Sequence, residues 1–221
     1  MRWLFGVLLF FVGVGFCGKV CGFSAVNTGN IGIEEHLNSS VPLELKFRDE
    51  NGTVVSLSDY FKEKPVLLNL VYFNCPMLCN LVLDGVVKSV NRLDNSKVDC
   101  FQMLAISIDP NDTSVSAFDY KKKHEKELIY KKVGEQWHFL VGDEQSIRRL
   151  ADSLGFKYEY NSETGEFGHA AVTFVLTPRG NISRYLYGTD YSPLDLKLSL
   201  AEANNGKSIS SIEKLLLFCY N

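Results

Sequence analysis

Apolar runs recur through the middle of this chain and alternate with segments of helical periodicity. Residues 65–73 form the clearest apolar run and predict a buried strand, and residues 80–90 after it predict a helix. Further extended segments are predicted over residues 98–108, 137–141, 155–160, 170–176 and 182–187, and further helices over 113–126, 143–154, 192–203 and 208–218. This order predicts one α/β domain with a central mixed sheet covered by helices on both faces.

Turn residues mark the N-terminal part of the domain. Residues 43–47 and 53–57 flank Asn51-Gly52 and predict a β-hairpin. A short helical turn is expected over residues 58–61. Residues 23–41 have the composition of a linker, and no internal repeat or second domain boundary is found, so the domain is assigned to residues 42–221.

The first 22 residues have the pattern of an export signal. Arg2 precedes an apolar run over residues 3–18, which Lys19 interrupts. As a helix this run reaches about 24 Å, less than a hydrocarbon core of about 30 Å. Extended to Phe23 it could span as an anchor. We therefore expect either cleavage near Gly22 or Ser24, or membrane anchorage through residues 3–23. Either outcome predicts an exported domain, periplasmic or on the outer face of the inner membrane if the source is bacterial.

Composition narrows the class of partner. The chain has 221 residues, 46% of them hydrophobic, and a formal net charge of −3, which is typical of a well-cored domain. The basic run Lys121-Lys122-Lys123 is short and adjoins acidic residues, so we interpret it as a solvated helix face. No nucleic acid partner is expected.

Two cysteines lie at the turn from the predicted central strand to the helix after it, in the sequence Cys75-Pro76-Met77-Leu78-Cys79. If Cys79 lies in the first helical turn, the two sulfurs can share one face. The positive end of the helix favours thiolates, which bind soft metals and attack disulfides. The chemistry is therefore metal capture or redox exchange.

The spacing of the two cysteines disfavours a thioredoxin-like redox motif, and the short loop between them and the small number of cysteines disfavour a structural disulfide. Thioredoxin-like redox motifs usually separate their cysteines by two residues, and here there are three. A disulfide would close a loop too short to restrict the unfolded chain much. Four cysteines remain after residue 22, namely Cys75, Cys79, Cys100 and Cys219, too few for a disulfide scaffold.

Several segments, in the right order, resemble the Sco/SenC family of copper-binding assembly factors for cytochrome c oxidase. They are the motif Asn-Cys-Pro-Met-Leu-Cys-Asn at residues 74–80, residues 54–60, residues 105–110, and residues 168–180 beginning Gly-His. The resemblance extends over nearly all of residues 43–218. It departs at Asn80, where many members carry proline, and at Cys219, which the family pattern does not explain.

The resemblance implies a thioredoxin-like fold, with an N-terminal hairpin, and a copper site formed by Cys75, Cys79 and His169. It also implies delivery of copper to the dinuclear copper site of oxidase subunit II. The residue types agree independently, because two thiolates and one imidazole suit Cu(I). Structural zinc sites usually have four protein ligands, and only three are offered here. Cu(II) would need a further donor.

Other candidates are weaker. Met77 is a candidate soft ligand, but a contact-surface role is favoured. Asp109 ends a strand where it could orient a ligand or cap a nearby helix. Cys100 is expected to be a buried core thiol. The other histidines, His36, His124 and His138, are interpreted as structural.

The sequence therefore predicts a copper metallochaperone, served by an upstream copper donor or thiol reductant and acting on subunit II or a similar copper acceptor. Copper would be held as Cu(I), and Cu(II) is conceivable. The main alternative is a thiol-disulfide oxidoreductase that reduces the cysteines of the acceptor site through Cys75 and Cys79. A redox or copper sensor without enzymatic activity is a third hypothesis.

Overall fold

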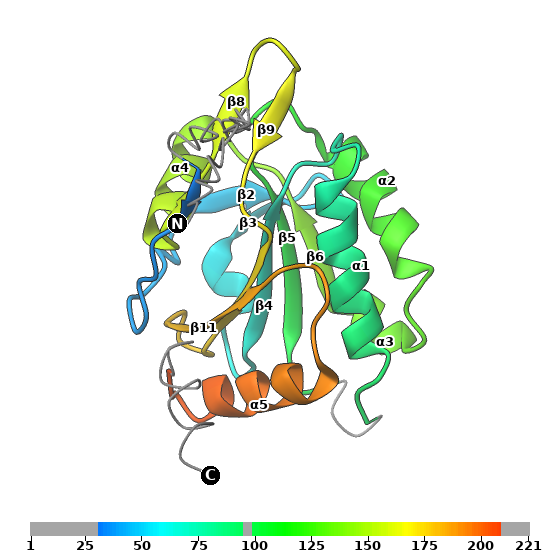
Figure 1. Cartoon of the computed structure of the whole chain (residues 1–221), viewed down its shortest axis with the longest axis vertical. Coiled ribbons are helices and arrows are strands. Elements are labelled where there is room, and N and C mark those ends of the chain that lie inside the picture. The colour runs from blue at the N-terminus through cyan, green and yellow to red at the C-terminus, as the bar shows by residue number, and fades with distance from the viewer. Residues whose placement is uncertain (1–30, 95–98, 209–221) are drawn as a thin grey trace, which may run out of the picture.

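The central feature of the fold is a five-stranded sheet, seen in a computed structural model that describes residues 31–94 and 99–208 (Figure 1). Its strands are β4 (Val66–Val71), β5 (Gln102–Ser107), β6 (Trp137–Leu140), β10 (Val172–Leu176) and β11 (Ile182–Tyr187), in the order β11–β10–β4–β5–β6. Strands β4, β5 and β6 are parallel, whereas β10 and β11 are antiparallel to their neighbours. The predicted mixed sheet is confirmed.

Helices cover this sheet from several directions. They are η1 (Leu57–Tyr60), α1 (Leu78–Val90), α2 (Ser114–Glu125), α3 (Lys131–Glu135), α4 (Glu144–Ser153) and α5 (Pro193–Asn204). In Figure 1, α1, α2 and α3 lie to the right of the sheet, α4 lies to its left, and α5 crosses below. Helix α3 was not predicted, because its five residues are mostly polar and show no periodicity. Within the described residues, no helix has the length and apolar character needed to cross a membrane.

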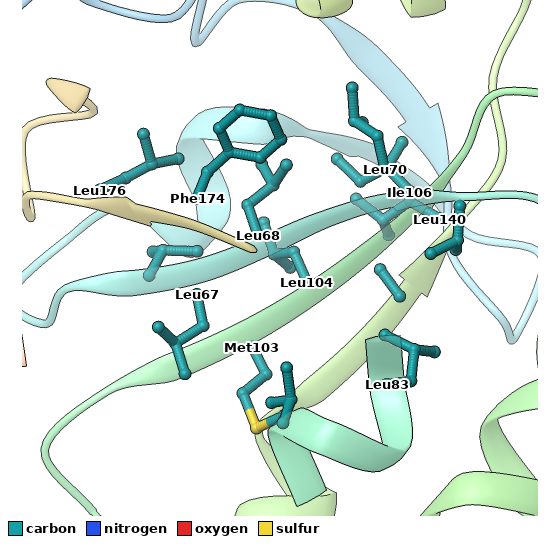
Figure 2. Packing of buried hydrophobic residues seen from close by; sticks show 14 of the residues in the cluster. Leu67, Leu68, Leu70, Leu83, Met103, Leu104, Ile106, Leu140, Phe174 and Leu176 are labelled. Carbon is teal, nitrogen blue, oxygen red and sulfur yellow. The ribbon is translucent and has the colours of Figure 1, made fainter. Parts of the chain in front are cut away.

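Apolar side chains fill both sides of the sheet. All six residues of β4 are buried, which explains why this strand is a continuous apolar run rather than an alternating one. Figure 2 shows Leu68 and Phe174 on one side of the sheet, and Met103 with Leu83 of α1 on the other. The sheet is thus rigidly packed at the strand that leads into the cysteine pair.

Three small two-stranded sheets surround the core. They are β2 (Lys46–Arg48) with β3 (Val54–Ser56), β1 (Gly32–Ile33) with β7 (Phe156–Lys157), and β8 (Glu159–Asn161) with β9 (Glu166–Gly168). The first is the predicted hairpin, and Gly52 in its turn has a φ of 83°. The β8–β9 hairpin was not predicted. It matters because β9 leads directly to His169.

Part of the segment assigned to a linker lies against the domain. Residues 32–33 form β1 and pair with β7, Val41 is buried, and the Asn38 N–H donates to the Ile182 carbonyl at 2.9 Å. Residues 31–41 therefore belong to the packed structure. The predicted signal and the last predicted helix over residues 208–218 lie outside the described residues, apart from Ser208.

The sheet topology brings distant parts of the sequence to one end. The end of β4 leads into the cysteine loop, and the end of its parallel neighbour β5 leads into residues 109–113. Strand β10 runs antiparallel to β4, with Phe174 opposite Leu68. The start of β10, and His169 just before it, therefore lie beside the end of β4.

Candidate metal centre

The cysteine loop has the strand-to-helix geometry that the sequence predicts. Cys75 follows β4, and its N–H donates to the Tyr72 carbonyl at 3.2 Å. Cys79 is the second residue of α1, and its N–H donates to Cys75 Sγ at 3.3 Å. The first helical turn thus aims a backbone donor at the first sulfur, as expected for an electropositive helix start.

His169 lies just before β10, the strand that pairs with β4, and its side chain contacts Cys79. Its Nε2 lies 3.2 Å from Cys79 Sγ, and its Nδ1 lies 3.0 Å from the Ala170 carbonyl oxygen. A carbonyl only accepts hydrogen bonds, so Nδ1 carries the proton and donates it. In the neutral ring, Nε2 then has a lone pair directed at the thiol. This is the tautomer that binds metal through Nε2.

The three side chains are recessed and well supported. The exposed fractions are 8% for Cys75, 0% for Cys79 and 8% for His169. The Tyr72 and Phe156 rings pack on the imidazole, with ring centroids 6.2 and 5.7 Å from it. The three side chains are therefore held by the packed core and are almost completely buried.

The two thiols have very different acidities. Cys79 donates its thiol proton to Cys75, and the N–H groups of Cys79 and Met77 add further hydrogen bonds, so the pKa of Cys75 falls to about 5 despite burial. The same thiol–thiolate hydrogen bond, together with burial, raises the pKa of Cys79 well above its usual range. At neutral pH the pair therefore holds one thiolate and one thiol.

The single thiol proton has two acceptors. The Cys75 thiolate is a hydrogen-bond partner of the Cys79 side chain, and His169 Nε2 lies 3.2 Å from Cys79 Sγ, but one S–H cannot serve both. Within the described residues, no group of three or more His, Cys, Asp or Glu side chains is arranged to hold a metal ion. The donor set suits a soft cation such as Cu(I), but the donors must turn toward a common point to bind it.

Asp112 was not predicted from the sequence, although its side chain binds the backbone directly before the cysteine loop. Its buried carboxylate accepts hydrogen bonds from the Phe73 N–H at 2.9 Å, the Ser107 hydroxyl at 2.6 Å and the Ser116 hydroxyl at 3.2 Å. Asp112 therefore ties the end of β5 and the start of α2 to the residues that precede Cys75. The only sequence signal was its place directly before Thr113, the cap of α2.

Asp109, the predicted orienting residue, has a different role. Its carboxylate accepts from the backbone N–H and side-chain amide of Asn111, at 2.9 and 3.0 Å. Among the described contacts, none joins Asp109 to the two cysteines or to His169. The residue of this segment that contacts the cysteine loop is Asp112, three residues later.

The remaining candidates lie as follows. The side chain of Met77 is 66% exposed beside the site, as a contact-surface residue would be. Cys100 is exposed, contrary to the expectation of a buried thiol, because β5 begins only at Gln102. His36 contacts the Ser153 carbonyl, His124 contacts Asp84, and His138 contacts Glu50. Cys219 lies outside the described residues.

Comparison with known proteins gives a consistent picture. Residues 34–200 match the sequence profile described as SCO1/SenC. A SCO2-like protein of Rickettsia conorii is 27% identical over 179 residues, which cover 76% of this chain and 78% of that protein. The curated relatives thus span most of the chain.

Solved structures show the same fold. A crystal structure from Aquifex aeolicus VF5 is 24% identical, covers 77% of this chain and 95% of its own, and has a TM-score of 0.67. Arabidopsis thaliana ScoI, solved with copper bound, is 18% identical, covers 73% and 96%, and has a TM-score of 0.59. At these identities the likeness establishes the thioredoxin-like architecture alone.

Proposed function

Because this chain belongs to the SCO1/SenC family, we propose that it is a copper metallochaperone for cytochrome c oxidase. Copper is its cargo, held by Cys75, Cys79 and His169 and passed to the dinuclear copper site of subunit II or a similar acceptor. The observation that carries this proposal is the approach of His169 Nε2 to Cys79 Sγ at 3.2 Å, with the opposite ring nitrogen fixed on a carbonyl.

The acid–base state of the site supports uptake of a soft cation. Cys75 is a thiolate at neutral pH, since its pKa is about 5. The imidazole offers a lone pair, and the Cys79 thiol releases its proton when copper takes its place. Copper affinity should therefore fall as the pH drops, because a proton competes with copper at Cys79, and it should fall more steeply below about pH 5, where protons also compete for Cys75. Transfer proceeds as acceptor thiolates replace these ligands one at a time.

A second function has its own support in the unequal thiols. A thiolate with a low pKa beside a buried protonated thiol is the arrangement of an attacking and a resolving cysteine. Cys75 would attack an acceptor disulfide and Cys79 would then resolve the mixed disulfide. The acceptor gains two electrons and one proton from this chain and a second proton from solvent, and Cys75 and Cys79 become a disulfide. Such a reductase needs no imidazole ligand.

We place either activity outside the cytoplasm, in the periplasm or on the outer face of the inner membrane if the source is bacterial. The support is the signal pattern of residues 1–22. Reduced cysteines there require an upstream thiol reductant, and loading requires a copper donor.

The variant His169→Ala separates the two functions. Oxidase copper-site assembly and thiol exchange on a subunit II peptide are measured together, with His36→Ala as the control histidine at a different part of the fold. A copper carrier loses assembly and keeps thiol exchange. Normal assembly by His169→Ala would rule out copper handling by this site and favour the reductase.

A further inference from the structure

The side chain of Asn80 connects the cysteine loop to helix α2. Its Nδ2 donates to the Cys75 carbonyl at 3.1 Å, and Lys123 Nζ donates to its Oδ1 at 2.7 Å. Both halves of the amide are therefore engaged, one with the loop and one with the neighbouring helix. We call this chain of contacts, from the Cys75 carbonyl through Asn80 to Lys123, the Asn80 clasp.

The clasp closes the loop that holds both sulfurs. Asn80 is the third residue of α1, and its side chain reaches back to the residue at which the loop begins. On the preceding side, Asp112 holds the Phe73 N–H. The backbone at Cys75 is thus fixed both before and after the sulfur-bearing residue, by groups attached to α2 or its start.

Lys123 is itself held over an aromatic surface. Its Nζ lies 5.7 Å from the centroid of the Tyr120 ring, and Tyr120 packs on Phe73 with ring centroids 5.2 Å apart. A cation near a ring face is attracted by the ring. The lysine is therefore less free than an ordinary surface side chain, which favours a lasting contact with Asn80.

We propose that Asn80 is a positioning residue of the copper site, which fixes Cys75 relative to Cys79 before the metal arrives. This inference rests on the proposed function. A preorganised loop loses less freedom on binding, and affinity rises accordingly.

The test compares two clasps on the same helix. Asn91 caps the far end of α1, where its side chain donates to the Glu127 carbonyl at 2.7 Å and accepts from the Ile129 N–H at 2.9 Å. Asn91→Ala removes an equivalent pair of contacts away from the copper site. It is the matched control for Asn80→Ala, because both variants should lose similar stability.

Two readouts are made on each variant: Cu(I) affinity of the reduced protein, and amide hydrogen exchange of metal-free protein over residues 73–81. Asn80→Ala should weaken copper binding on the order of threefold to tenfold, the value of one net hydrogen bond. Its loop amides should exchange faster. Asn91→Ala should leave both quantities unchanged.

Two further variants test the two hydrogen bonds of the Asn80 clasp separately. Asn80→Asp keeps an acceptor for Lys123 but turns an oxygen toward the Cys75 carbonyl, so it should bind copper as weakly as Asn80→Ala. Lys123→Met should have a smaller effect, and none in the Asn80→Ala background, since the lysine acts only through Asn80.

Unchanged loop exchange in Asn80→Ala overturns the clasp, whatever the copper result. Faster exchange with unchanged copper affinity also overturns the positioning role. If the wild-type protein binds no copper, the proposed function fails by that result alone, and loop exchange still decides whether Asn80 holds the loop.

Discussion

The carboxylate of Asp112 accepts four hydrogen bonds beside the cysteine loop, from the Phe73 N–H, the Asn74 amide and the hydroxyls of Ser107 and Ser116. In Asp112→Asn the negative charge is removed and an amide NH₂ replaces one acceptor oxygen, so the groups that donate to that oxygen lose their acceptor. We expect a loss of about 1–3 kcal/mol in the free energy of unfolding, measured by urea denaturation. Asp119→Asn, an exposed change in helix α2, which begins two residues after Asp112, is the control. Equal stability of the two variants would show that Asp112 does not support the loop.

A second buried carboxylate predicts a pH dependence. Burial alone would raise the pKa of Glu50, but hydrogen bonds from His138, Lys121 and the Phe139 N–H outweigh it and lower this pKa from 4.5 to about 2. A lowered folded-state pKa stabilises the protein above the unfolded value of 4.5 and loses that effect as pH falls through 2. The contribution at neutral pH is about 3 kcal/mol.

Glu50→Gln should therefore be less stable than wild type at pH 7 and lose less stability on acidification. The measurement is urea denaturation at several pH values between 7 and 2, with exposed Glu163→Gln as the control. A difference between wild type and Glu50→Gln that stays constant over this range contradicts the assignment.

At the scale of single residues, the sequence identified those whose chemistry is rare. Two cysteines at a strand-to-helix turn and a histidine before a strand stand out because few other roles explain them. Asp109 and Asp112 could not be told apart, since both lie in one polar turn. Only the direction of each carboxylate, set by the fold, shows that Asp112 contacts the loop.

At the scale of elements, helix α1 carries a close contact that propensity would not suggest. A Cβ at Gly85 would lie 2.2 Å from the backbone oxygen of Thr189. Alanine favours helix over glycine by about 1 kcal/mol, yet Gly85→Ala should destabilise the protein by about 2–3 kcal/mol, because backbone must move. Thermal or urea unfolding measures this.

Gly134 in α3 provides the comparison. A Cβ there would meet only the flexible side chain of Glu125, so Gly134→Ala should be neutral or slightly stabilising. If Gly85→Ala and Gly134→Ala both increased the free energy of unfolding by similar amounts, the close contact between α1 and the Thr189 backbone would be contradicted.

Elements with strong periodicity were predictable, and short ones were not. The five sheet strands and the four long helices follow from apolar runs and helical periodicity, with Thr113 as the cap of α2, whereas Asp143, predicted as a helical residue, is the N-cap of α4. Helix α3 and the β8–β9 hairpin are short and mostly polar, and tertiary contacts such as that of Phe167 with Tyr72 hold the hairpin. This hairpin leads directly to His169, so the candidate ligand was predictable from the sequence but the element that positions it was not.

At the scale of the whole molecule, the described residues begin at residue 31, beyond the predicted signal of residues 1–22. Deleting residues 1–22 should leave a folded domain that binds copper as before, because the packed structure includes residues from 32 onward. Circular dichroism and copper content check this. Loss of copper binding on deletion would instead implicate Cys17 or Cys21.

The pairing of strands in the sheet determines that the site residues lie close together. Cys75 and His169 are 94 positions apart in the sequence, and the antiparallel pairing of β4 with β10 brings them to one end. Hydrophobic periodicity predicts each strand but not this pairing. The family resemblance supplied the association that local patterns could not.

The most direct measurement is anaerobic Cu(I) titration of the reduced protein, of the same protein with Cys75 and Cys79 oxidised, and of His169→Ala. We expect one copper per chain in the reduced wild type and almost none after oxidation, because a disulfide removes both thiolate donors. His169→Ala should bind more weakly, through two sulfurs. Equal copper uptake by the oxidised protein, or unchanged affinity in His169→Ala, would contradict the three-residue copper site.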